Sequence, residues 1–169
     1  MHVLVADLDE YRATVGQEFS GYGEALAEVS RARAELSEFA RGVHPRVLTE
    51  EGLASALADL ARRAPLPVSV EAPAARISAA VEAAAYFVCS EALANVGKYA
   101  QASGASIDVR LTDNRLVIAV RDDGVGGASL AKGSGLRGLA DRVEALGGRL
   151  HVESRPGHGT IVSAELPLS

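Results

Sequence analysis

The sequence is short of aromatic residues and of cysteine. Aromatic side chains make up 4% of the 169 residues and Trp is absent, so a core must rest on Ala, Val and Leu, which the 48% hydrophobic content allows. The single cysteine, Cys89, cannot form an intrachain disulfide, and a reducing compartment is expected. No run reaches about 18 uncharged apolar residues, and the acidic N-terminus does not resemble a signal peptide. We therefore expect a soluble chain with no membrane contact from this segment.

The sequence also lacks an excess of positive charge. Its formal net charge is -5 at neutral pH, which argues against nucleic acid or an anionic membrane as the main partner. A nucleotide is not excluded, because it needs only a local anion-binding site. The length fits one domain, or one domain with a helical extension.

The first half of the chain is predicted to be mainly helical. Apolar residues over 22–43 recur at intervals of three and four, interrupted by Arg33. This pattern indicates an amphipathic helix that either packs on its own domain or forms a dimer, and Pro45 ends it. A second helix is expected to start at Thr49, its N-cap. A short strand between prolines follows, and then a long helix over 78–100.

In the second half the period of the apolar residues changes to two. Strands are expected over 104–112 and 115–123, followed by a glycine-rich loop and a helix over 135–148 with Gly147 as its C-terminal cap. A closing hairpin over 149–168 completes the pattern. The order of elements predicts an α+β sandwich, with one mostly antiparallel sheet and helices on one face.

The long helix carries three polar residues in one row, at offsets of four and three: Glu91, Asn95 and Lys98. An Asn carbonyl oxygen can bind Mg²⁺, a Lys can neutralise phosphate charge, and a Glu can orient a water molecule or accept a proton. The simpler interpretation is that all three are only solvated. The downstream glycine-rich segments favour the ligand-binding interpretation.

Two glycine-rich segments follow the long helix. Asp122 ends a strand and precedes glycines at 124, 126 and 127, so its carboxylate could accept a hydrogen bond from an exocyclic amine such as that of adenine. In isolation, a hairpin turn is the better explanation of this segment, although three glycines are more than a tight turn needs. The second segment, 133–138, leads into a helix whose free N–H groups could bind phosphate. It is not a P-loop, because no Lys-Ser or Lys-Thr pair closes it.

These three segments resemble the boxes of the GHKL superfamily of ATPases and kinases, which use the Bergerat ATP-binding fold. "EALANVGKYA" is similar to the N box, "DDGVGG" to the first glycine box, and "GSGLRGLADRVEALGGRLHVESRPGHGT" to the second glycine box and closing hairpin. Within the superfamily the chain resembles the catalytic domain of bacterial sensor histidine kinases of the NarL/DesK-like class, over roughly residues 35–167. The resemblance implies a two-layer Bergerat sandwich over 49–169. It also implies an N-terminal helical segment over 1–48, with part of a dimerisation region and a linker.

The resemblance also implies ATP and Mg²⁺ as cofactors and assigns roles to residues. Asn95 would hold Mg²⁺, Glu91 would assist catalysis, and Asp122 would bind the adenine amine. Gly124 and Gly126 would form the wall of the nucleotide pocket, and Thr160 would lie behind the adenine. The phosphates would be bound by Lys98, Gly133, Gly135 and Leu136. Tyr99 stands where the family usually has His, so the role of that His does not carry over.

The family's phosphoacceptor, a His followed by Asp, is missing from the sequence. The four histidines, His2, His44, His151 and His158, are better explained as structural or solvated. We therefore expect an ATP-dependent histidine kinase module that phosphorylates a histidine-bearing dimerisation domain outside this segment, in the same full-length kinase or in a partner chain. From that histidine, the phosphate is expected to pass to a response regulator. The expected location is the cytoplasm, free or as the cytoplasmic part of a membrane-bound sensor, and homodimerisation through the N-terminal helix is one option.

Two other functions stay open at this stage. One is a non-catalytic, ATP-sensing regulatory partner, which Tyr99 and the missing acceptor favour. The other is a GHKL serine kinase of the anti-sigma type, which the match from Gly135 onward disfavours. The sequence does not identify the signal, the response regulator, or whether the chain is a fragment or half of a split kinase.

Overall fold

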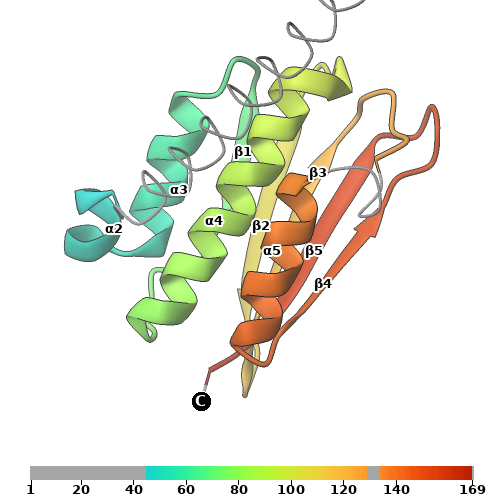
Figure 1. Cartoon of the computed structure of the whole chain (residues 1–169). Helices are drawn as coiled ribbons and strands as arrows, with labels where there is room; N and C mark the ends of the chain where they lie inside the picture. The colour runs from blue at the N-terminus through green and yellow to red at the C-terminus, as the bar shows by residue number, and fades with distance from the viewer. Residues whose placement is uncertain (1–44, 129–133, 169) are drawn as a thin grey trace, which may run out of the picture. The chain divides into compact units, whose positions relative to one another are not determined.

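Five strands form one sheet in the order β1-β2-β3-β5-β4 (Figure 1). The computed structural model describes residues 45–128 and 134–168, so the helix expected over 22–43, the first two histidines and Gly133 lie outside the described residues. The strands are β1 (Val68–Glu71), β2 (Ala105–Leu111), β3 (Arg115–Asp122), β4 (Arg149–Glu153) and β5 (Thr160–Pro167). Only β1 and β2 pair in parallel, and the other pairs are antiparallel. The predicted mostly antiparallel sheet is therefore confirmed.

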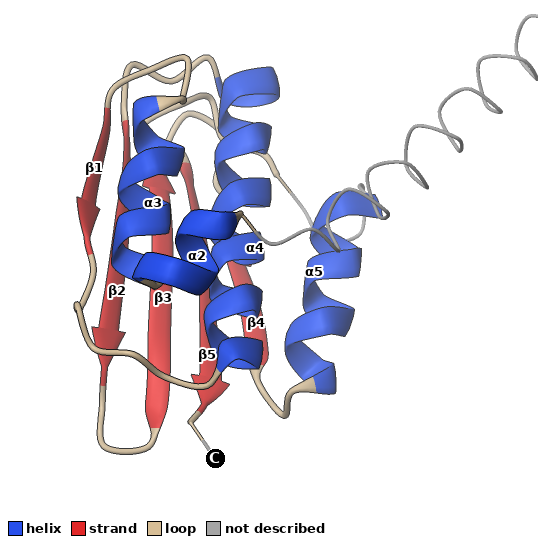
Figure 2. Ribbon diagram, turned by 90° about the vertical axis from the view of Figure 1, so that its left-hand side faces the viewer, coloured by secondary structure: helices blue, strands red, loops and turns tan. Residues whose placement is uncertain are grey.

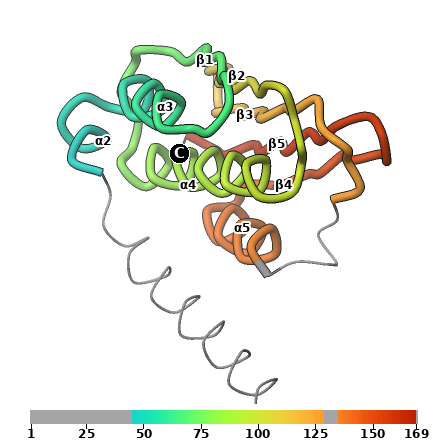
Figure 3. Tube along the Cα trace, turned by 90° about the horizontal axis from the view of Figure 1, so that it is seen from above, coloured from blue at the N-terminus to red at the C-terminus, as the bar shows by residue number. Residues whose placement is uncertain are grey.

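The described helices lie on one face of this sheet (Figures 2 and 3). They are α2 (Arg46–Glu51), α3 (Leu53–Arg62), α4 (Ala79–Asn95), the π-helix η1 (Val96–Ala100) and α5 (Ser134–Ala145). Helix α3 packs against β1, α4 packs against β3 and β5, and α5 packs against β4. The α+β sandwich predicted from the element order is confirmed.

The prediction of a single helix capped by Thr49 was wrong. The helix starts at Arg46, directly after Pro45, whose restricted φ suits a helix start. Thr49 lies inside α2, and Gly52 separates α2 from α3 with φ +91° and ψ -177°, a conformation that suits only glycine. A Cβ at Gly52 would lie 2.7 Å from Cδ of Arg76. The side chain of Arg76 thus lies over the break, although the two residues are far apart in the sequence.

Helix α4 forms the centre of the core. Every side chain from Val81 to Cys89 is buried, and the helix contacts α3, α5, β3 and β5. Its length and composition, together with those of η1, would suit a membrane span, but most of this segment is buried inside the fold, as in a core helix. Burial raises the pKa of the Cys89 thiol to about 12. Aliphatic side chains dominate the core, as predicted, with Leu57, Ile107, Leu116, Ile118, Val120, Val143 and Leu166 among the most deeply buried.

Helix α5 docks on α4 and so positions the second glycine-rich segment. The guanidinium of Arg142 lies 4.7 Å from the ring centroid of Phe87, a cation–π contact between the two helices. The helix ends at Ala145, and two residues later the N–H of Gly147 donates to the carbonyl of Glu144 at 2.8 Å, with Gly147 at φ +70°. The predicted capping role of Gly147 is confirmed. The buried side chains that hold α5 in place are Leu136, Leu139 and Val143.

Candidate functional site

The polar row predicted on the long helix lies where α4 passes into η1. Glu91 and Asn95 are half-buried and one α-helical turn apart, so they lie on one face of α4. Lys98 is exposed and belongs to η1. Because a π-helix has wider turns than an α-helix, the α-helical spacing applies to Glu91 and Asn95 but not to Lys98.

None of these three side chains forms a hydrogen bond or ion pair with another described residue. Within the same described part of the chain, no side-chain nitrogen or oxygen is both fully buried and unpaired. The carboxylate of Glu91, the amide of Asn95 and the amine of Lys98 are therefore reachable from solvent. They retain the capacity to bind a ligand.

Asp122 ends β3 and is half-buried. Its Oδ1 accepts a hydrogen bond from the backbone N–H of Gly124 at 2.9 Å, and its Oδ2 accepts none from the described residues. One oxygen is thus fixed by the following loop, and the other can accept a hydrogen bond from a ligand. Thr160 is the β5 partner of Asp122 in the ladder between β3 and β5, which places it beside the carboxylate-bearing residue.

The adjacent aspartate is arranged differently. Asp123 accepts hydrogen bonds from the hydroxyl and the N–H of Ser103 and from the N–H of Gly104, the last two at 2.8 Å and 3.2 Å. These bonds, led by that from the Ser103 hydroxyl, lower the pKa of Asp123. Asp123 therefore holds two loops together, and of the two aspartates only Asp122 keeps an unpaired oxygen for a ligand.

The glycines after Asp122 allow close packing of the chain against itself. A Cβ on Gly124 would collide with the carbonyl oxygen of Ala100, and the next N–H, of Val125, donates to that oxygen at 2.8 Å. Gly126 has φ +66°, and a Cβ there would collide with the carbonyl oxygen of Arg155. The close neighbours of both glycines are atoms of the protein itself, mostly of its backbone, with the Cβ of Ala100 also beside Gly124. The loop is thus fastened between η1 and the hairpin of β4 and β5.

Ser154 is a residue of this site that the sequence did not indicate. Its hydroxyl lies 2.9 Å from the hydroxyl of Thr160, accepts from the N–H of Ala128 at 3.0 Å, and lies 3.3 Å from the carbonyl oxygen of Gly159. It therefore links the glycine-rich loop to the start of β5. A serine directly after a strand gives no distinct sequence signal, because such serines are common in turns.

The second glycine-rich segment meets α4 at Glu91. A Cβ on Gly135 would collide with Oε1 of Glu91, so glycine allows the start of α5 to approach this carboxylate. The side chain of Leu136 is buried in the core, and so only its backbone could contact a ligand. Both residues lie in the first turn of α5, where N–H groups have no partner within the helix.

The donor set fits a magnesium nucleotide better than a metal held by protein alone. Among the described residues no group of three or more His, Cys, Asp or Glu side chains could hold a metal ion. Mg²⁺ characteristically takes only one or two protein oxygens and completes its shell with phosphate and water. The amide oxygen of Asn95, with the carboxylate of Glu91 one turn away, suits that type of binding.

Residues 80–169 match the family model described as histidine kinase-, DNA gyrase B- and HSP90-like ATPase. The chain belongs to this family. The chain is 36% identical over 159 residues to the sensor histidine kinase NarS of Mycobacterium tuberculosis, covering 86% of this chain and 36% of that protein. It is 34% identical over 93 residues to the oxygen sensor histidine kinase NreB of Staphylococcus carnosus, covering 53% of this chain and 27% of that one. The chain thus spans about a third or less of these relatives.

Solved structures agree with this assignment. The ATPase domain resembles the histidine kinase domain of the blue-light-activated histidine kinase EL346 of Erythrobacter litoralis, with a TM-score of 0.57 and 26% identity over 68% of this chain and 57% of that one. The histidine kinase AdeS of Acinetobacter baumannii shares the fold, with a TM-score of 0.55 and 18% identity over 70% of this chain and 62% of that one. The predicted Bergerat-type fold and the predicted ATP-binding catalytic domain of the histidine kinase type are confirmed.

Proposed function

We propose that this ATPase domain transfers the γ-phosphate of ATP to a histidine on another chain or on a segment outside this one, as part of a two-component sensor kinase. The observation that carries the proposal is the set of unpaired acceptors on Glu91, Asn95 and Asp122. They stand on elements that are fastened together by the contacts of Ala100 with the glycine loop. An acid, a metal-binding amide and an adenine-binding acid are the groups that this chemistry needs.

Each residue has a role in this proposal. Asp122 accepts the hydrogen bond of the adenine amine through Oδ2, with Gly124 and Gly126 forming the wall beside it and Thr160 behind it. The N–H groups of the first α5 turn, at Gly135 and Leu136, bind the phosphates together with Lys98 in this proposal, and Gly133, which lies outside the described residues, is assigned the same role. Asn95 supplies one oxygen to Mg²⁺, which when bound neutralises charge on the transferring phosphate. Glu91 orients or deprotonates the attacking group.

The acceptor is proposed to lie outside this segment because neither described histidine suits the role. His151 is exposed on β4, and its Nε2 lies 3.6 Å from the carboxylate of Glu153. Its strand neighbours Leu150 and Val152 pack against the core, so His151 faces away from the helices and from the end of α4. His158 is exposed in the turn between β4 and β5.

The division into a helical segment over 1–48 and a catalytic domain over 49–169 remains a proposal, although α2 already starts at Arg46. We also propose a cytoplasmic location for this domain, with a response regulator and a histidine-bearing dimerisation domain as its partners. A dimer of this chain through residues 22–43 would be lost when the chain is truncated to start at Thr49.

The test is phosphoryl transfer with labelled ATP and Mg²⁺, first with the chain alone and then with a histidine-bearing hairpin from a related sensor kinase. The expected result is acid-labile label on the hairpin and none on this chain. ATP binding without any transfer would support the non-catalytic alternative, for which the exposed Tyr99 in place of the usual His is the specific observation. Acid-stable label on a serine would instead support the serine kinase.

A further inference from the structure

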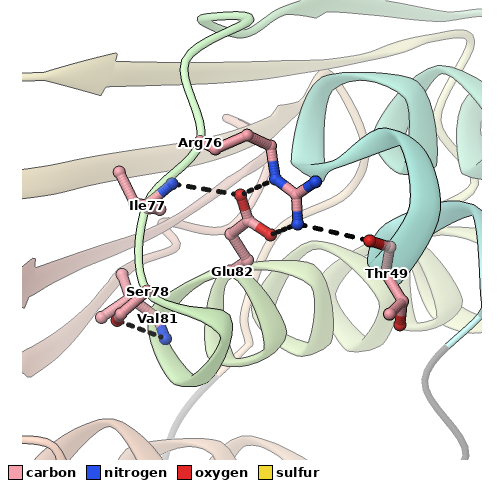
Figure 4. A network of polar contacts seen from close by, with 6 residues as sticks. All are labelled: Thr49, Arg76, Ile77, Ser78, Val81 and Glu82. Atoms are coloured by element: carbon pink, nitrogen blue, oxygen red, sulfur yellow. Dashed lines mark hydrogen bonds and ion pairs between the residues drawn. The ribbon is translucent and has the colours of Figure 1, made fainter.

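Glu82 is the one polar or charged residue that is buried among those the structure describes, with 1% of its surface exposed. It lies in the first turn of α4. Arg76 forms a bidentate ion pair with it, from Nε to Oε1 at 2.9 Å and from Nη2 to Oε2 at 3.1 Å (Figure 4). The N–H of Ile77 also donates to Oε1 at 3.2 Å. The buried carboxylate is thus well satisfied by hydrogen bonds.

Arg76 also reaches helix α2. Its Nη2 donates to the carbonyl oxygen of Thr49 at 3.4 Å, one of the terminal carbonyls that α2 leaves without a helical partner (Figure 4). The stem of Arg76 lies over Gly52, so a Cβ at that position would require the Arg76 side chain to shift. A cation therefore stands at the C-terminal end of α2 and an anion at the N-terminal end of α4, and both placements suit the helix dipoles.

Apart from Arg76, helix α2 is held by its contacts with α3 and, to a lesser extent, with α4. It has six residues, its N-cap is a proline without a hydrogen-bonding side chain, and Leu48 is its one buried residue. A helix this short is not stable alone, so its position depends on tertiary contacts. It is also the first described element, the point at which residues 1–44 join the ATPase domain.

We propose that Arg76 and Glu82 are positioning residues that couple α2 to α4, the helix that carries the proposed catalytic groups at its other end. The inference rests on the proposed function. Helix α4 is continuous from Glu82 to Asn95, a rise of about 20 Å at about 1.5 Å per residue. A displacement of α2 pulls on Arg76 and hence on the first turn of α4. By reciprocity, nucleotide binding at the far end of α4 stabilises α2.

Hydrogen–deuterium exchange of the full chain, with and without ATP and Mg²⁺, tests this coupling. Without nucleotide, Arg76→Gln should speed exchange both in α2 and in the first turn of α4. In the wild type, ATP should slow exchange in α2 by about fivefold or more, the lower end of known couplings. That effect should vanish in Arg76→Gln and in Glu82→Gln, although protection of residues 122–128 by ATP persists.

Two further variants separate positioning from stability. Arg76→Leu combined with Glu82→Leu fills the site with apolar groups, which often restores stability but provides no directional link. This pair should regain the melting temperature without regaining the effect of ATP on α2. Arg46→Ala removes the exposed ion pair with Glu50 on the same helix and should leave the coupling intact.

The outcomes distinguish the inference from the proposed function. ATP protection at 122–128 with no change in α2 of the wild type would overturn the coupling alone, as would an unchanged ATP effect in the double leucine variant. Unaltered exchange in nucleotide-free Arg76→Gln would overturn it too. Protection by ATP in neither segment would overturn the proposed function and the coupling with it.

Discussion

The two ends of α4 use the same kinds of side chain in opposite ways. At the N-terminal end, the Glu82 carboxylate is bound by Arg76 and by the N–H of Ile77. At the C-terminal end, Glu91 and Asn95 form no hydrogen bond with the described residues. Hydrogen bonds completed within the protein fix its shape, whereas uncompleted ones are available to a ligand. The comparison indicates that a polar residue on a core helix must be judged by its partners and not by its type.

The largest effect should follow from a change at the unpaired end. Asn95→Ala removes the amide oxygen proposed to hold Mg²⁺, so phosphoryl transfer to a supplied histidine hairpin should fall by at least about a hundredfold. Even outer partners of metal ligands are worth about 10–100-fold. Binding of ATP without Mg²⁺ should persist in calorimetry. Asn95→Asp keeps an oxygen ligand and serves as the control. Normal turnover by Asn95→Ala would contradict the proposed binding of Mg²⁺ by Asn95.

The next effect concerns adenine recognition. In Asp122→Asn the amide can still accept from Gly124 through its oxygen, but it then presents an NH₂ group to the adenine amine. The loss of a hydrogen bond to a charged group costs about 1.5–3 kcal/mol, or roughly ten- to a hundredfold in ATP affinity. Asp123→Asn is the matched control, because that carboxylate is already bound by Ser103 and Gly104. Calorimetry should find the loss of ATP affinity only in Asp122→Asn. Equal ATP affinities of the two variants would contradict the assignment of Asp122 to the adenine site.

A pair of identical substitutions tests the comparison itself. Glu82→Gln places an amide where Arg76 and Ile77 need an acceptor, and an unsatisfied buried group costs about 1–3 kcal/mol of unfolding free energy. Glu91→Gln changes a half-buried carboxylate without partners, so its unfolding free energy should change by no more than about 0.5 kcal/mol. Urea unfolding measures both. Equal destabilisation by the two variants would contradict the distinction between the ends of α4.

The smallest effect is a pH dependence at Asp123. Because hydrogen bonds lower its folded-state pKa below the usual 3.8, its contribution to stability is present above that value and is lost as the pH falls through the folded-state pKa. The difference in unfolding free energy between wild type and Asp123→Asn should therefore be largest near neutral pH and shrink below about pH 4. Urea unfolding at pH 7 and pH 3 tests this. A difference in unfolding free energy that grows on acidification would contradict the lowered pKa of Asp123.

Local patterns were enough to predict most of the fold. The alternation in β2 and β3 and the glycine after α5 follow from short-range rules, and the structure agrees with both. The break at Gly52 was not predictable in this way, because a glycine within a helical pattern does not reveal its φ, and the side chain of Arg76 that lies over it comes from a distant part of the sequence. Long-range contacts of this kind leave no periodic signal.

The candidate site was predictable to a similar degree. The three segments and their order pointed to Glu91, Asn95 and Asp122. The sequence could not show that Asp123 is fully engaged by Ser103, that Ser154 links the loop to β5, or that η1 widens the turn around Lys98. Each of these depends on how separate segments meet in space.

The buried Cys89 gives this molecule a built-in reporter. It is the only thiol in the chain, and it lies on α4 between the paired and the unpaired ends. Since burial raises its pKa to about 12, the native thiol is protonated at neutral pH and shielded from alkylating reagents. Alkylation must then wait for the core around α4 to open, so the labelling rate, divided by that of a free thiol, gives the free energy of this opening directly. No label need be engineered into the protein to compare its variants.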